Sequence, residues 1–161
     1  MYYINYFFIM SIFGHLIESL LSSSNDSGIL FSYWTPIYGF GTIIILLLNN
    51  FLNKKHLNKF TKLISLFFCS TITLAIIESA GGYLLKFLFN KELWNYSNHK
   101  FNIGKYTSLE MALFWGTTSI FLIYIIKPII DKIINKIPKF VSYILIFLFI
   151  IDVFLTLIIK T

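Results

Sequence analysis

Long apolar segments alternate with short polar stretches along the whole chain. A helix needs about 20 mostly apolar residues to cross the hydrocarbon core of a bilayer. The segments that meet this requirement lie at residues 2–21, 36–52, 63–85, 108–126 and 140–159. The sequence therefore predicts an all-α membrane protein, a compact bundle of about five transmembrane helices in a single transmembrane domain that takes in residues 1–161.

A shorter amphipathic segment separates the last two apolar segments. Pro128 and Pro138 bracket residues 129–137, in which isoleucines recur at helical spacing with charged residues between them. Proline fixes part of the backbone and lacks a hydrogen-bond donor, so it commonly marks a helix boundary. We expect a separate short helix here, lying in the membrane interface.

The composition agrees with a membrane location. Of the 161 residues, 57% are hydrophobic and only 12% are charged. A soluble domain of this size cannot bury so much apolar surface, so lipid must cover the remainder. The net charge of +6 comes from 13 basic residues, all lysines, which lie in short loops rather than on one face. This pattern argues against nucleic-acid binding and makes the lipid bilayer the expected partner. We expect no cofactor.

The distribution of lysines predicts how the chain is oriented. The loops after the second and fourth apolar segments hold eight lysines, whereas the loop after the third segment and the C-terminus together hold five. Cytoplasmic loops carry the excess of positive charge in multi-pass membrane proteins. We therefore expect the N-terminus in the cytoplasm and the C-terminus outside. The abundance of Ile, Asn, Lys, Phe and Tyr, without arginine, is typical of an AT-rich bacterial genome, so the membrane is the cytoplasmic membrane.

Ionisable residues within the apolar segments gather at one end. Glu18 and Asp152 lie toward the ends of the first and last segments, Glu78 lies in the last third of its segment, and Glu110 begins another. Because successive helices run in opposite directions, all four acids fall in the same half of the bilayer. Charged side chains inside a membrane are costly and rarely face lipid. We therefore expect Glu18, Glu78 and Asp152 to face one another in an acidic pocket near the outer leaflet.

Helical spacing gives two of these acids similar stripes of neighbours. Spacings of four and three residues place one stripe at Ser11, His15 and Glu18, and the other at Thr71, Ala75 and Glu78. The sequence nevertheless shows no internal repeat. The candidate pocket residues, drawn from the stripes, the Pro36–Gly41 turn and the longest loop, are His15, Glu18, Tyr38, Gly39, Glu78, Trp94, Tyr96, Glu110 and Asp152.

Several acids beside one histidine admit three kinds of chemistry. They can relay protons, hold a cation, or act as general acid and base on a lipid-borne substrate. No metal-ligand, nucleophile or nucleotide-binding motif selects among these, and no metal site is predicted. Ordinary roles stay open as well, because His15 and Glu18 can pair with each other and Glu110 can simply begin a helix. Glu78 lies deepest in its segment and is the strongest candidate.

Motifs spread over nearly the whole chain resemble one bacterial membrane family. In chain order they are Gly14 through Glu18 and Ser19, Pro36-Ile37-Tyr38-Gly39-Phe40-Gly41, Glu78, Trp94-Asn95-Tyr96-Ser97, Phe101-Asn102, Gly104, Trp115-Gly116 and the helix of Asp152. The chain resembles the ABC-transporter type IV, or CmpB-like, family, although His15 stands where an aromatic residue is usual. The resemblance implies a permease partnered with a separate ATPase subunit. We expect that subunit to dock on the cytoplasmic loops 53–62 and 127–139.

A second, shorter likeness keeps another interpretation open. Trp94-x-Tyr96, Gly104 and Glu110-x-x-x-Phe114-Trp115 look like the tail motif of small membrane-embedded lycopene cyclases. That likeness implies a proton donor role for Glu110 toward an isoprenoid. The leading interpretation is therefore a permease-type subunit. The alternatives are a small membrane enzyme acting on a lipid or isoprenoid, and a structural subunit of a larger membrane complex.

Overall fold

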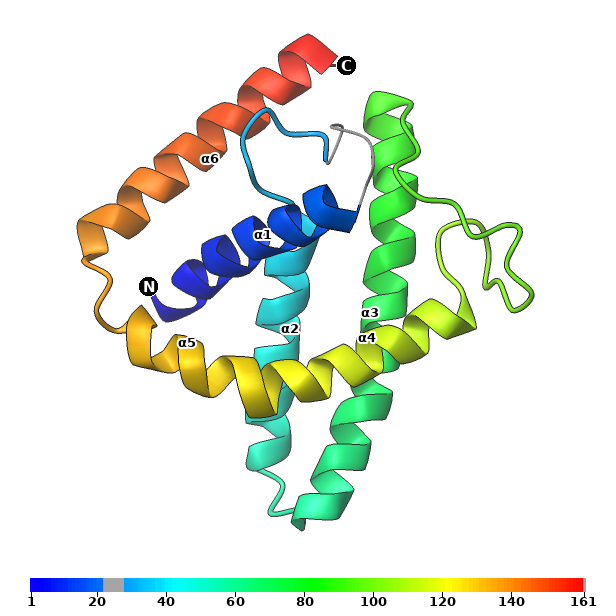
Figure 1. The fold of residues 1–161 in the computed structure, drawn as a ribbon, viewed down its shortest axis with the longest axis vertical. Coiled ribbons are helices and arrows are strands. Elements are labelled where there is room, and N and C mark those ends of the chain that lie inside the picture. The colour runs from blue at the N-terminus through cyan, green and yellow to red at the C-terminus, as the bar shows by residue number, and fades with distance from the viewer. Residues whose placement is uncertain (22–27, 161) are drawn as a thin grey trace. The chain divides into compact units, whose positions relative to one another are not determined.

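The computed structural model describes residues 1–21 and 28–160 (Figure 1). The elements are α1 (Tyr2–Leu21), α2 (Pro36–Asn53), α3 (Lys59–Phe89), α4 (Leu109–Phe121), the π-helical turn η1 (Leu122–Ile126), α5 (Lys127–Ile134) and α6 (Lys139–Lys160). The described residues hold no β-strand, only an isolated bridge between Asn102 and Ser108. The predicted all-α class is therefore confirmed, and the helices begin and end close to the predicted apolar segments.

Caps explain why α3 is longer than the apolar segment 63–85. The Asn58 side chain accepts a hydrogen bond from the backbone N–H of Thr61 at 2.8 Å, which satisfies a donor of the first turn. At the other end, Asn90 adopts a left-handed conformation with φ of 52°, and its N–H donates to the Lys86 carbonyl. Polar cap residues outside the apolar run thus extend the helix to 31 residues.

The prediction of a separate helix at residues 129–137 is wrong. The helix continues through Pro128, so that Leu109–Ile134 forms one helical stretch. Proline lacks an N–H, and its ring clashes with the carbonyl four residues earlier in a regular α-helix. The preceding turn η1 is π-helical and wider, with the Lys127 N–H donating to the Leu122 carbonyl. Because the wider turn relieves the clash, the helix passes the proline without ending.

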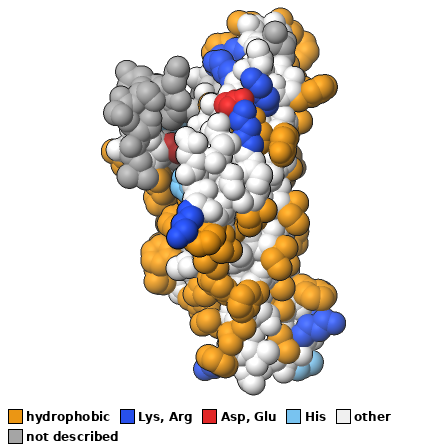
Figure 2. Space-filling model, turned by 90° about the vertical axis from the view of Figure 1, so that its right-hand side faces the viewer, with side chains coloured by type: hydrophobic (Ala, Val, Ile, Leu, Met, Phe, Trp, Pro, Cys, Tyr) orange, Lys and Arg blue, Asp and Glu red, His pale blue; other side chains and the backbone are white. Residues whose placement is uncertain are grey.

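Four helical stretches of the described chain are long and apolar enough to cross a membrane. They are Pro36–Asn53, Lys59–Phe89, Leu109–Ile134 and Lys139–Lys160. Exposed apolar residues follow one face of α3 at a spacing of four, as at Phe68, Ile72 and Ile76. Figure 2 shows such side chains spread along much of the face that it draws. These faces suit contact with lipid.

The first helix differs from these four. It is 20 residues long, as predicted, but it is not among the candidate spans. Polar side chains along it lower its hydropathy, and Asn5, Ser11 and His15 are all buried inside the protein. The crossing of the membrane by α1 therefore stays a prediction.

The chain divides into two compact units, which we describe separately. The first unit comprises Met1–Ile43 and Ile129–Thr161, and the second comprises Ile44–Pro128. In the first unit α1 packs against α6 around the buried side chains of Phe7, Phe8 and Trp34. In the second unit α3 packs against α4, which crosses it (Figure 1). Whether residues 1–161 act as one domain stays a prediction.

Candidate functional site

Glu78 is the most enclosed acid of the second unit. It lies on α3 with 5% of its surface exposed. Its Oε1 accepts hydrogen bonds from Trp115 Nε1 at 3.0 Å and from the Tyr96 hydroxyl at 3.3 Å. Its Oε2 accepts a bond of 2.8 Å from the Thr107 hydroxyl. Neutral donors thus surround the carboxylate, and no lysine or histidine pairs with it among the residues that the structure describes.

The loop between α3 and α4 carries two of these donors to Glu78. Trp94 Nε1 donates to the Tyr106 carbonyl at 3.1 Å, which ties the two sides of the loop together. The Tyr106 ring lies directly on Gly82 of α3, where a Cβ would overlap it. This close contact holds the loop against the last turns of α3. Tyr96 and Thr107 are thereby brought over the Glu78 carboxylate.

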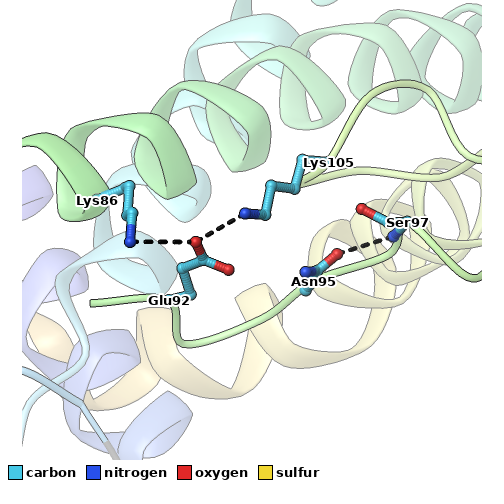
Figure 3. A network of polar contacts seen from close by, with 5 residues as sticks. All are labelled: Lys86, Glu92, Asn95, Ser97 and Lys105. Atoms are coloured by element: carbon cyan, nitrogen blue, oxygen red, sulfur yellow. Dashed lines mark hydrogen bonds and ion pairs between the residues drawn. The ribbon is translucent and has the colours of Figure 1, made fainter. Parts of the chain in front are cut away.

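A charged cluster lies on the outside of the same loop (Figure 3). Glu92 pairs with Lys105 at 2.7 Å and with Lys86 of α3 at 3.4 Å. The hydrogen bond from Lys105 and the charge of Lys86 lower the pKa of Glu92. On the inner side, burial and the Glu78 carboxylate raise the pKa of the Tyr96 hydroxyl. Tyr96 therefore stays a protonated donor to Glu78 at physiological pH.

Glu18 is held in the first unit by two residues around the start of α2. The Thr35 hydroxyl donates to Glu18 Oε2 at 3.2 Å, and the Tyr38 side chain also hydrogen bonds Glu18. Two glycines make this approach of α1 and α2 possible. A Cβ at Gly14 would overlap the Tyr38 ring, and a Cβ at Gly39 would overlap the Ser11 hydroxyl.

His15 lies one turn before Glu18 on α1. Its side chain is 8% exposed, and its Nδ1 has no hydrogen-bond partner. The ring contacts Tyr33 edge to face, with 5.4 Å between the ring centroids. Most buried polar groups are satisfied, so an unpartnered ring nitrogen in this place is unusual. His15 therefore remains a candidate for proton or ligand binding.

Asp152 holds a segment of backbone rather than lining an open space. Its carboxylate accepts bonds of 2.9 Å from the backbone N–H groups of Phe31 and Ser32, and one of 2.7 Å from Trp34 Nε1. Buried backbone donors need such partners. Asp152 therefore fixes the residues that lead into α2, while Glu18 holds Thr35, the residue immediately before α2.

Glu110 stands apart from these sites. It is exposed in the first turn of α4, where the preceding Ser108 caps the helix by accepting from the Met111 N–H. Two aromatic residues of the cyclase-like motif, Tyr96 and Trp115, donate to Glu78 instead. The structure therefore does not favour a catalytic role for Glu110 on an isoprenoid.

The structure joins some of the predicted site residues and not others. Tyr96 hydrogen bonds Glu78, Tyr38 hydrogen bonds Glu18, and Trp94 donates to a backbone carbonyl of its own loop. Because Glu78 belongs to a different unit from Glu18 and Asp152, the meeting of these three acids stays a prediction.

Sequence reasoning overlooked several donors that complete these sites. They are Trp34, Thr35, Thr107 and Trp115. The threonines lie just before α2 and α4, and a buried indole N–H needs a hydrogen-bond partner, which is a usable signal. Another overlooked cluster lies at Asp131, whose Oδ1 accepts from the hydroxyls of Tyr2 and Tyr6.

Comparison with known proteins places the chain in a family. Its residues 5–157 match the family model described as "Putative ABC-transporter type IV". Neither the curated proteins nor the solved structures give a match to this chain. The matched range takes in Glu18, Glu78 and Asp152 with the residues that hold them. The chain therefore belongs to the family of that description.

Proposed function

We propose that this chain is the membrane-spanning subunit of an ABC-type transporter in the bacterial cytoplasmic membrane. Family membership and the four apolar helices support this assignment. The N-terminus lies in the cytoplasm, because the loops with eight lysines then lie on the cytoplasmic side. The chain contains no nucleotide-binding motif, so ATP hydrolysis belongs to a separate subunit.

The main support for a functional role inside the membrane is the environment of the Glu78 carboxylate. A carboxylate enclosed within an apolar helix is costly, and neutral donors stabilise it without cancelling its charge. Thr107, Tyr96 and Trp115 supply such donors. The site is therefore suited to receive a positive charge that arrives with the transported species or as a proton.

The partner ATPase docks on residues 53–62 and 127–139. Residues 53–60 are all exposed and include Lys54, Lys55 and Lys59, which suits a protein contact better than a lipid contact. The segment ends in the capped first turn of α3, so the docking surface continues directly into a membrane helix. Movement of the ATPase can thereby reach the helix that carries Glu78.

Purification of the tagged chain from the membranes of its own host tests this proposal. We expect ATP hydrolysis to accompany the purified complex and to fall when Lys54 and Lys55 are both replaced by Glu. In the matched control, Lys91 and Lys100 are both replaced by Glu. These lysines are also exposed, in the loop between α3 and α4 on the opposite side of the membrane in the predicted topology, and their replacement should leave hydrolysis unchanged. A chain that carries no ATPase after cross-linking in intact cells would refute the proposal, as would hydrolysis insensitive to Lys54 and Lys55.

A further inference from the structure

Glu18 and Glu78 occupy equivalent places on their helices. Each lies seven residues, or about two helical turns, after a buried hydroxyl residue on the same face: Ser11 precedes Glu18, and Thr71 precedes Glu78. Neither hydroxyl has a hydrogen-bond partner. On α3 the neighbouring Ser70 hydroxyl is also buried without a partner, but Thr71 lies at the same seven-residue spacing from its glutamate as Ser11 does.

The hydroxyls of Ser11 and Thr71 each lie against a glycine of the following helix. A Cβ at Gly39 of α2 would overlap Ser11 Oγ, and a Cβ at Gly116 of α4 would overlap Thr71 Oγ1. Small residues permit such close backbone approach between membrane helices. The pairs α1–α2 and α3–α4 are therefore joined by the same kind of contact, a hydroxyl packed on a glycine.

The residue before each of these glycines is an aromatic hydrogen-bond donor to the glutamate. Tyr38 precedes Gly39 and bonds Glu18. Trp115 precedes Gly116 and donates to Glu78 at 3.0 Å.

A threonine just before the second helix completes each site. Thr35 precedes α2 and donates to Glu18 at 3.2 Å, while Thr107 precedes α4 and donates to Glu78 at 2.8 Å. The shared plan is therefore a hydroxyl residue, a glutamate, a threonine and an aromatic-glycine pair, in that order along the chain.

The two copies also differ. Tyr38 and Gly39 are the third and fourth residues of α2, whereas Trp115 and Gly116 are the seventh and eighth of α4, a displacement of about one turn. Ala75 occupies the place of His15 in the second copy. Few positions are shared, so the sequence alone shows no repeat. In the predicted topology, α1 and α3 cross the membrane in the same direction.

We propose that α1–α2 and α3–α4 are two copies of one carboxylate-bearing helical hairpin, and that Glu18 and Glu78 are equivalent protonation sites. Parallel internal repeats are a common plan of membrane transporters. The duplication follows from contacts inside each unit and does not depend on an ATPase partner. Its consequence for transport rests on the proposed function.

The donors around Glu78 favour a proton over a metal ion. A metal ion of the calcium or magnesium type takes oxygen ligands, whereas the indole N–H of Trp115 is a donor only. When a proton reaches the carboxylate oxygen beside Thr107 or Thr35, the threonine hydroxyl can turn and accept a hydrogen bond from the protonated carboxyl group. The titratable groups that face the two glutamates are His15 and Tyr38 at Glu18, and Tyr96 at Glu78.

Labelling with an apolar carbodiimide tests the equivalence without any transport assay. The reagent adds to protonated carboxyl groups within lipid, and mass spectrometry of the full chain in nanodiscs assigns each label. We expect labels at both Glu18 and Glu78, both falling as the pH rises, and none at Asp152, whose oxygens are held by backbone donors. The exposed Glu92 serves as the control for a carboxyl group in water.

Two variants sharpen the test. His15→Ala makes the first site resemble the second, so the pH profile of Glu18 labelling should move toward that of Glu78. Adding Ala75→His to the His15→Ala chain should separate the two profiles again. Infrared spectroscopy provides an independent measurement, since Glu18→Gln and Glu78→Gln should each remove one protonated carboxylic acid band and Glu92→Gln should remove none. Protonation confined to one glutamate, or to neither, by both methods would overturn the proposal even if an ATPase partner is found.

Discussion

The indole Nε1 of Trp115 donates to Glu78 Oε1 at 3.0 Å, so a side chain of α4 reaches a carboxylate of α3. Tyr96 donates to the same oxygen, whereas Thr107 donates to Oε2. The two oxygens therefore meet different partners. An indole N–H can only donate, while a threonine hydroxyl can turn and accept. This difference decides which substitutions of Glu78 the fold tolerates.

We expect Glu78→Gln to fold normally and to abolish transport by the complete complex. The amide oxygen can take the place of Oε1, and the amide NH2 then faces a Thr107 hydroxyl that can accept from it. Glu78→Leu instead leaves buried donors unsatisfied, at about 1–3 kcal/mol each. Thermal unfolding in detergent, followed by tryptophan fluorescence, should place the Gln variant near wild type and the Leu variant well below it.

Glu92→Gln is the matched control for these variants. Glu92 is an exposed acid of the same unit, so its substitution should change neither transport nor the unfolding temperature appreciably. Full transport by the Glu78→Gln protein, with loss only in variants that misfold, would make Glu78 a structural residue and defeat the proposed site.

Asp152→Asn should behave differently from Glu78→Gln. The Asp152 oxygens meet two backbone N–H groups and the Trp34 indole, none of which can accept a bond from an asparagine NH2. We expect a loss of about 1–3 kcal/mol in unfolding free energy and faster proteolysis at residues 28–35. Thr156→Val is the control, since Thr156 makes only a 3.4 Å contact with Asp152. An Asp152→Asn protein as stable as wild type would show that the clamp is dispensable.

Gly116→Ala should destabilise the α3–α4 pair by about 1–3 kcal/mol through overpacking. The added methyl group overlaps Thr71 Oγ1, so Thr71→Ala in the same chain should restore most of the loss. Thr71→Ala alone should cost little, because its hydroxyl has no hydrogen-bond partner. Thermal unfolding of the two single variants and the double variant measures this coupling, with the exposed Thr117→Ala as control. Additive effects would contradict the packing described.

The tyrosines at the start of α1 should stabilise the first unit through Asp131. Tyr2 and Tyr6 donate to Asp131 Oδ1 at 2.8 and 2.7 Å, and Tyr6 is fully buried. We expect Tyr6→Phe to lower the unfolding free energy by about 0.5–1.5 kcal/mol. Tyr6→Phe and Asp131→Ala should be less than additive when combined, since each removes the same bond. Tyr143→Phe, at an exposed position of α6, should have no effect, and strict additivity of the first pair would refute the interaction.

The orientation of the chain can be tested by cysteine labelling in intact cells. Cys69 is first replaced by Ser, because it is exposed on α3. A cysteine at Asn98, in the loop before α4, should then react with an impermeant maleimide, whereas a cysteine at Asn58 should react only after the cells are opened. The opposite result at both positions would invert the predicted topology.

The sequence by itself determined the helices and their approximate ends. Apolar runs of sufficient length must form helices in lipid, because every backbone donor and acceptor there needs an internal partner. The same pattern marked Glu18, Glu78 and Asp152 as costly groups that need enclosure. These conclusions depend only on properties of neighbouring residues, which the sequence contains directly.

The tertiary structure decided which groups enclose each acid. Thr107 and Trp115 lie 29 and 37 residues from Glu78, and Trp34 lies 118 residues from Asp152, so no helical spacing relates them. Pro128 predicts a helix boundary from the sequence, yet the π-helical turn before it lets the helix continue. The spacing before Glu18 and Glu78 is alike in the sequence, but the matching contacts from α2 and α4 appear only in three dimensions, because they join helices at a few positions that are displaced by about one turn.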